Sequence, residues 1–161
     1  MDITYRYSTV GDADAINGLI ERHFGLRKEC GALEALDGRY LLAFDGDRLV
    51  ALTGISGDTQ FDGLEVDWTC CDEAYRHHGL ITDMLRRCLK GADRDVYCSC
   101  WHEQGHEHVN LHHAMSELGF ELLLKQCRAY KAPYYKACIA CARYHDGIAC
   151  ECTEDLYVKR I

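Results

Sequence analysis

The chain has 161 residues and a mass of 18.3 kDa, which suits one compact domain. Its content of 48% hydrophobic and 27% charged residues excludes a disordered or low-complexity chain. Asp and Glu (26) outnumber Lys and Arg (18), and the resulting net charge of −8 repels a phosphate backbone. Nucleic acid is therefore not an expected partner.

Cysteine is unusually frequent, with 11 residues, and an odd number of thiols cannot all pair in intramolecular disulfides. The first residues lack the apolar run of a secretory signal, and the sequence has no stretch of about 18 apolar residues that could cross a membrane. We therefore expect a cytoplasmic protein with reduced thiols and no membrane partner. In that compartment, neighbouring cysteines are metal ligands or small buried apolar side chains.

Apolar periodicity and turn residues predict the order of the elements. The expected strands are 3–9, 39–44, 48–55, 64–71, 95–101, 120–130 and 155–161, and the expected helices are 12–24, 79–90 and 111–118. Asp45-Gly46 favours a tight hairpin turn between the second and third strands. Antiparallel hairpins at the start and a β-α-β unit in the middle predict a single domain over 1–161 of the α+β class with a mixed sheet.

The last two expected strands are separated by Pro133 and by a polar, cysteine-rich stretch at 134–152. This connection is much longer than an ordinary hairpin loop. We expect it to be an insertion with a function of its own.

The segment from Tyr75 to Leu85 lies where the middle strand turns into a helix. Such a turn directs unpaired backbone N–H groups and the positive end of the helix dipole at one point, which favours a phosphate or diphosphate. Gly79 would permit close approach of the ligand, and Arg76 with His77 and His78 could add charged donors. The alternative is a solvated helix cap with a chance basic cluster.

The pattern Arg76-x-x-Gly79-Leu80-Ile81 resembles the Arg/Gln-x-x-Gly-x-Gly/Ala signature of the GCN5-related N-acetyltransferase (GNAT) superfamily. The ending Glu117-Leu118-Gly119-Phe120 looks like the Lys-x-Gly-Phe that closes the family's fourth helix, although Ile81 replaces a small residue of the signature. The resemblance implies a central mixed, mostly antiparallel sheet flanked by about four helices. It also implies acetyl-CoA as the co-substrate.

The same resemblance assigns roles to the residues around the turn. It implies that the turn binds the diphosphate and that main-chain groups at the end of the middle strand contact the pantetheine arm. The implied residues are Cys70, Cys71, Asp72, Arg76, His77, His78, Gly79, Leu80, Ile81 and Thr82. Many family members carry a tyrosine acid at the position of Met115; Tyr130, Tyr134 or Tyr135 could replace it, or the thiolate leaves without an acid.

Glu65 and Asp67 are the candidate general bases. They lie two residues apart on one strand, so both side chains project from the same sheet face. A carboxylate there could take the proton of an attacking amine, directly or through water. The expected activity is direct transfer of an acetyl group to an unidentified primary amine. Alternatively, each of the two acids is simply an acidic residue on a solvent-exposed face of the sheet.

Two short cysteine pairs, Cys138-x-x-Cys141 and Cys150-x-Cys152, supply four thiolates. Four thiolates suit a tetrahedral structural zinc ion that would tie down a loop without a core. Free thiols and redox pairing are the alternatives.

His102-Glu103-x-x-His106 matches the pattern of zinc peptidases, whose two histidines share one helical face. The residues before His102 form an expected strand and Gly105 interrupts a helix, so this activity is a remote alternative. A second alternative is a non-catalytic acyl-CoA-binding or protein-interaction module.

Overall fold

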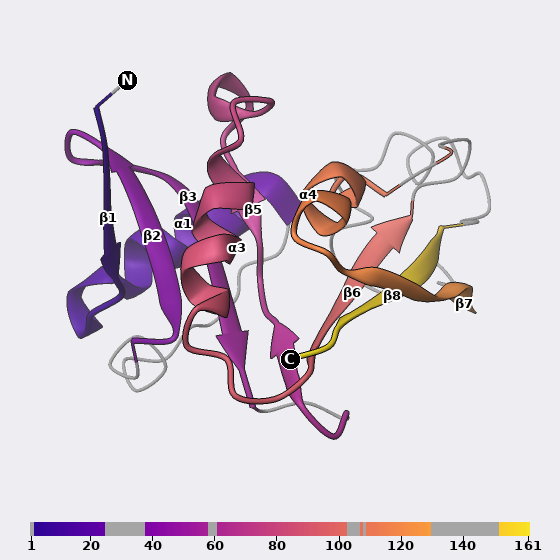
Figure 1. Cartoon of the computed structure of the whole chain (residues 1–161). Coiled ribbons are helices and arrows are strands. Elements are labelled where there is room, and N and C mark those ends of the chain that lie inside the picture. The colour runs from indigo at the N-terminus through magenta and orange to yellow at the C-terminus, as the bar shows by residue number, and fades with distance from the viewer. Residues whose placement is uncertain (1, 25–37, 58–60, 103–106, 108, 130–151) are drawn as a thin grey trace, which may run out of the picture.

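The computed structural model describes residues 2–24, 38–57, 61–102, 107, 109–129 and 152–161 (Figure 1). Its strands are β1 (Ile3–Tyr7), β2 (Tyr40–Asp45), β3 (Arg48–Ser56), β4 (Leu64–Val66), β5 (Cys70–Cys71), β6 (Val96–His102), β7 (Glu121–Ala129) and β8 (Thr153–Lys159). Its α-helices are α1 (Ala13–Phe24), α3 (Leu80–Leu89) and α4 (His112–Glu117), and two 3-10 turns are η1 (Val10–Asp12) and η2 (Glu73–Tyr75).

The described strands form one sheet in the order β1-β2-β3-β4-β6-β8-β7, with β5 paired to β3 beside this path. The parallel pair in this sheet is β4 and β6, and the other pairs are antiparallel. α3 lies between β4 and β6 in the chain, because parallel strands need a long crossover connection. The result is a mixed, mostly antiparallel sheet.

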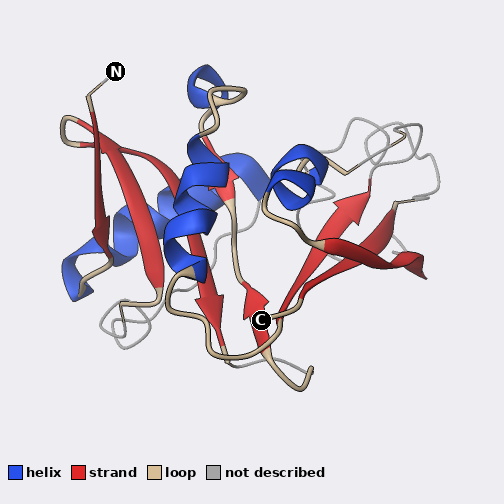
Figure 2. Cartoon of the chain, in the orientation of Figure 1, coloured by secondary structure: helices blue, strands red, loops and turns tan. Residues whose placement is uncertain are grey.

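The helices cover the two faces of the sheet. α1 packs on one face, whereas α3 and α4 lie on the other (Figure 2). Ile16, Leu19 and Ile20 of α1 are fully buried against β2 and β3. On the opposite face, Met84 of α3 packs on β2 and β3, while Leu85 of the same helix packs on β6 and α4. α3 therefore joins the core of the first half of the sheet to that of the second half.

The predicted α+β fold is confirmed, and the predicted elements differ from the observed ones mainly at their ends. About four helices were expected, and the described residues contain three α-helices. The predicted strand over 64–71 is wrong as one element, because it is divided into β4 and β5. The cysteine-rich insertion lies outside the described residues except for Cys152. In the described part of the chain, no helix is long and apolar enough to cross a membrane.

Candidate functional site

The central strands part from each other where β4 ends. β4 pairs with β6 at Leu64↔Val96 and Glu65↔Tyr97, whereas β5 pairs with β3. Among the described residues, the remainder of β6 has β8 on one side and no strand on the other. β5 and β6 diverge from this point (Figure 1). Both edges thus present backbone N–H and C=O groups that a ligand could bind.

Local hydrogen bonds explain the break between β4 and β5. The Trp68 N–H donates to Asp67 Oδ1 at 2.8 Å, and the Thr69 hydroxyl donates to the Asp67 carbonyl at 2.9 Å. The same hydroxyl lies 2.7 Å from the hydroxyl of Thr53 on β3. Short polar side chains that bond to nearby backbone compete with a ladder of strand hydrogen bonds. The alternating pattern of 64–71 did not reveal this competition.

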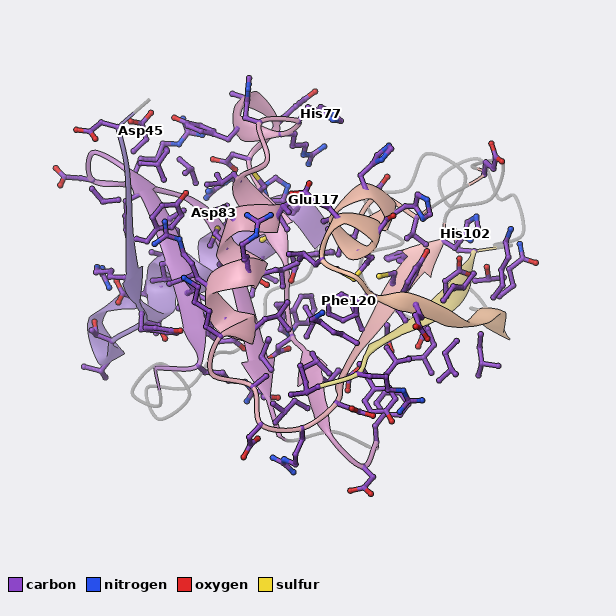
Figure 3. The ribbon with its side chains drawn as sticks, in the orientation of Figure 1. Asp45, His77, Asp83, His102, Glu117 and Phe120 are labelled. Atoms are coloured by element: carbon purple, nitrogen blue, oxygen red, sulfur yellow. The ribbon has the colours of Figure 1, made fainter. Side chains whose placement is uncertain are left out.

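The chain after β5 is held in a defined turn. The Tyr75 hydroxyl of η2 donates to Asp45 Oδ2 at 2.7 Å and so attaches the turn to the β2–β3 hairpin. His77 and Gly79 have φ angles of 63° and 75°, and α3 starts at the next residue, Leu80. Positive φ angles turn the backbone sharply at this point. Figure 3 shows His77 at the tip of the loop above α3.

The start of α3 is accessible to an anion. Residues 76–79 are exposed, and no side chain of the described residues caps the helix at Gly79. A Cβ atom at Gly79 would have no atom within 4 Å. The first N–H groups of a helix lack partners within it and carry the positive end of its dipole. The predicted cradle is therefore open in the residues that the structure describes.

Two side chains of the motif contact other parts of the protein. Ile81, which replaces the small residue of the signature, packs against two of the core clusters. Arg76 was expected to add a donor there, but its Nε donates to the Cys71 carbonyl at 3.1 Å and its Nη2 lies 3.2 Å from His23 Nδ1. The arginine side chain is therefore directed toward α1.

Cys70 and Cys71 are buried strand residues. Each is 7% exposed, and burial raises the pKa of Cys70 to about 12 and that of Cys71 to about 11. Both thiols thus remain protonated at neutral pH and are poor nucleophiles. Their backbone, at the end of the diverging strand, remains the part that could contact a ligand.

The two candidate bases differ in their surroundings. Val66 faces the core under α3 and α4, so Glu65, its neighbour on β4, lies on the opposite, α1 face. Asp67 Oδ2 lies 2.8 Å from Arg39 Nε and accepts a hydrogen bond from the Tyr40 hydroxyl at 3.0 Å. Asp67 therefore contributes to the stability of the fold through Arg39 and Tyr40.

The remaining predicted residues are the candidate general acids and the zinc ligands. Met115 is fully buried in the core, so this position of α4 supplies no acid. Tyr130, Tyr134, Tyr135 and the zinc ligands Cys138, Cys141 and Cys150 lie outside the described residues. Cys152 is half-buried, and the described residues hold no group of three or more His, Cys, Asp or Glu side chains that could bind a metal.

His102 does not have the geometry of a zinc peptidase ligand. It ends strand β6 rather than lying on a helix, and Glu103 and His106 lie outside the described residues. Its ring is buried, and its Nδ1 lies 3.0 Å from Asp155 Oδ2 on β8. Figure 3 shows His102 at the end of β6, on the right of the view and away from His77.

A basic cluster around Asp72 was not predicted. His23 Nε2 and Arg48 Nη2 lie 2.9 and 2.6 Å from its carboxylate oxygens, and Arg22 Nη2 lies at 3.6 Å. Burial opposes ionisation of Asp72, but the hydrogen bonds from His23 and Arg48 with the nearby arginine charges hold the pKa of this carboxyl below its ordinary value. These partners are 24 and 49 residues away in the sequence, and no local motif indicates them.

The sequence of this chain matches no known protein in the comparisons, whereas its structure matches known structures. No family profile and no curated protein matches the sequence. A GNAT-family acetyltransferase from Bacillus cereus is similar over 99% of this chain and 98% of its own, with a TM-score of 0.66 and 12% identity. A GNAT-family acetyltransferase from Streptococcus pneumoniae matches over 99% of this chain and 100% of its own, at a TM-score of 0.66 and 14% identity.

A third similar structure is a diaminobutyrate acetyltransferase from Paenibacillus lautus, described in complex with its substrate and coenzyme A. It matches over 98% of this chain and 93% of its own, with a TM-score of 0.66 and 16% identity. The chain thus has the fold of the GNAT acetyltransferases, and the resemblance noted in the sequence is confirmed at the level of structure. Identities this low show the fold and leave the activity to be tested.

Proposed function

We propose that the protein is an N-acetyltransferase that moves an acetyl group from acetyl-CoA to a primary amine. The observation that carries this proposal is the uncapped, exposed turn at Gly79, next to central strands that diverge within a GNAT fold. The backbone N–H groups of 77–82 would bind the diphosphate, with the dipole of α3 favouring its charge. Main-chain groups of Cys70, Cys71 and Asp72 would orient the pantetheine arm.

The transfer itself needs a neutral amine next to the thioester. Glu65, on the α1 face of β4, would accept the proton of the amine, directly or through one water molecule. The amine nitrogen then forms a bond to the acetyl carbon, and the carbon–sulfur bond breaks to release the CoA thiolate. α4 has Met115 at the position where many family members carry a tyrosine, so this helix offers no tyrosine to protonate the thiolate.

Titration with acetyl-CoA, followed by calorimetry, tests the proposal without knowledge of the acceptor. Gly79→Glu places a carboxylate in the cradle, and Gly79→Gln is the matched control with a similar size and the same backbone strain. We expect Gly79→Glu to bind acetyl-CoA at least tenfold more weakly than Gly79→Gln, because like charges repel at the phosphate site. Absence of binding by the wild-type protein, or equal affinity of the two variants, would contradict the proposal.

A non-catalytic acyl-CoA-binding or protein-interaction module is the second candidate. The buried Met115 and the ion pair that engages Asp67 favour it, since both remove groups that could aid turnover. Mass spectrometry of acetyl-CoA consumption with a panel of primary amines separates the two functions. Acetylated amine supports the transferase, whereas binding of acetyl-CoA without turnover on any amine supports the module.

We also propose that the insertion binds one structural zinc ion through Cys138, Cys141, Cys150 and Cys152. Four thiolates at this spacing supply the tetrahedral ligand set that zinc prefers. Metal analysis of the purified protein should give one zinc per chain, and Cys138→Ser should lose it. Cys88→Ser, on α3, is the control and should retain it. Equal zinc content in both variants would contradict the site.

A further inference from the structure

β7 is an edge strand with an exposed apolar surface. It ends the sheet opposite β1, with β8 on one side and no strand among the described residues on the other (Figure 1). Leu122, Leu123 and Leu124 are 47%, 45% and 50% exposed, and they are three of the six large apolar side chains exposed in the described part of the chain. Single exposed apolar residues are ordinary, whereas a contiguous group of them marks an interaction surface.

The three leucines surround the edge of the sheet and do not share one face. Leu122 pairs with Tyr157, which belongs to the core cluster under α3 and α4. Leu124 pairs with Leu156, the neighbour of Tyr157 on β8. Because paired residues share a face and neighbours in a strand alternate, Leu122 and Leu124 project from opposite faces. The register shift at Leu123, between these two residues, causes this change of face.

This arrangement determines from which side a partner binds. An element that covered one face of the sheet would contact Leu122 or Leu124 but not both. A partner that approaches the edge itself contacts all three leucines at once. The register shifts of β7 against β8 also interrupt the regular backbone of this edge, which disfavours pairing with another strand. The contact is therefore made by side chains.

The charges beside the leucines are arranged symmetrically. Glu121 and Lys125 are both exposed, and each lies two residues from Leu123. The segment 121–125 thus has no net charge in a chain of −8, so two copies can approach here without like-charge repulsion. When two copies of the segment lie antiparallel about a two-fold axis at Leu123, Glu121 of each copy lies beside Lys125 of the other. A parallel arrangement would instead place like charges together.

We propose that two copies of this chain associate through β7, antiparallel about a two-fold axis at Leu123. The leucines form the apolar centre of the interface, and Glu121 and Lys125 form its charged rim. Because this apolar centre is small, we expect a weak dimer that dissociates on dilution. The association does not require acetyl-CoA and is therefore independent of the proposed function.

Sedimentation equilibrium over a range of protein concentrations tests the proposal. The wild-type protein should approach twice the chain mass of 18.3 kDa at high concentration. Leu123→Asp should raise the dissociation constant about tenfold or more, because it places two carboxylates at the two-fold axis. Val10→Asp is the matched control and should leave the constant unchanged, since Val10 is 49% exposed and follows β1 at the opposite end of the sheet.

Charge reversals test the antiparallel arrangement and leave the leucines in place. Glu121→Lys alone and Lys125→Glu alone each put like charges at both ends of the interface, and each should raise the dissociation constant about fivefold. In an equal mixture, each variant meets its complement, so a mixed dimer should form with an affinity within about twofold of the wild-type dimer.

Three results would overturn the proposal. A monomer at every concentration would exclude the dimer and leave the leucines to a different protein partner. A dimer that Leu123→Asp leaves intact, or that Val10→Asp weakens equally, would place the interface elsewhere. A mixture of the two charge variants that associates no better than either variant alone would exclude the antiparallel arrangement of β7.

Discussion

His77 and Gly79 have positive φ angles within three residues of each other, just before α3. For a residue with a side chain, this region of backbone space is unfavourable, whereas glycine adopts it readily. His77 therefore carries local strain at the proposed anion site. Strained backbone that persists in a folded protein is compatible with a function at that place.

Gly79→Ala should lower the free energy of unfolding by about 1 kcal/mol, because alanine is strained at a positive φ. Space does not oppose the new methyl group, since no atom lies within 4 Å of its position. Urea denaturation measures the change. Gly91→Ala is the control, because Gly91 also lies in open surroundings but is not among the residues with positive φ. A loss as large in the control would show that backbone strain is not the cause.

Asp12 should make the stability of the protein depend on acid pH. Its carboxylate accepts two hydrogen bonds from Arg6, at 2.6 and 2.7 Å, and two from Thr9, both at 2.7 Å. The bonds from Arg6 are the main cause that holds the pKa of Asp12 well below its ordinary value, against the effect of burial. The stabilisation is thus complete above the unfolded pKa of about 4 and is lost as the pH falls below it.

Asp12→Asn should therefore lower the free energy of unfolding by about 2 kcal/mol at pH 7, as expected for charged hydrogen bonds. The difference from the wild-type protein should shrink as the pH falls from about 4 toward 2. Denaturation at several pH values measures it. Asp14→Asn makes the same charge change at an exposed position of α1 and should have little effect at any pH. A difference independent of pH would exclude the ion pair as its source.

Glu65→Gln should lower kcat about a hundredfold or more, the range for loss of a general base, with unchanged affinity for acetyl-CoA. Asp67→Asn should instead reduce stability, because it weakens the contacts with Arg39 and Tyr40. Steady-state kinetics on an accepted amine and calorimetry together measure both effects. A kcat of Glu65→Gln equal to that of the wild-type enzyme would remove Glu65 from the mechanism.

At the scale of elements, α3 is the helix that combines packing with the proposed site. Its N-terminal end forms the proposed anion cradle, and its buried side chains contact the cores of both halves of the sheet. Arg86 of α3 also donates to Glu117 of α4 at 2.7 Å on the surface. Since an exposed ion pair contributes little, the apolar contacts determine the position of the helix.

Leu85→Ala should lower the free energy of unfolding by about 3 kcal/mol, because it leaves a cavity at a fully buried position between α3 and β6. Leu124→Ala on the edge strand β7 removes a side chain that is 50% exposed and should cost less than about 1 kcal/mol. Guanidinium chloride denaturation compares the two. Similar losses would contradict the packing of α3 described here.

In the molecule as a whole, the two halves of the sheet are joined at its centre by few paired residues. β4 pairs with β3 at two positions and with β6 at two positions, while its neighbours have longer ladders. A ligand that binds between the diverging strands would connect the two halves. Binding to the native state alone should therefore be visible as stabilisation of the complete fold.

Acetyl-CoA at a hundred times its Kd should add about 2.7 kcal/mol to the free energy of unfolding. For a domain of this size, this corresponds to a rise of about 5–10 °C in Tm. Thermal scans measure it, with adenosine as the ligand control because it lacks the diphosphate. Gly79→Glu should shift by less than about 2 °C at the same ligand concentration. A shift as large as that of the wild-type protein would place the ligand elsewhere.

Local signals in the sequence predicted most of the elements and the candidate turn. Periodic apolar residues predicted α1 and α3, and Asp45-Gly46 predicted the β2–β3 hairpin, because these signals lie within a few residues of each other. The start of α3 is likewise set by a local signal, because the helix begins directly after Gly79.

The tertiary structure alone decided how side chains from distant segments meet. The position of Arg76 depends on His23, 53 residues away, and the basic cluster around Asp72 depends on contacts of this residue with α1 and β3. In the division of 64–71 into two strands, the local hydrogen bonds of Asp67 are joined by a contact of Thr69 with the distant Thr53 of β3. The spacing of apolar residues and the capping of helices depend on residues that are close in the sequence. Charged side chains pair through space, so their pairing leaves no pattern along the sequence.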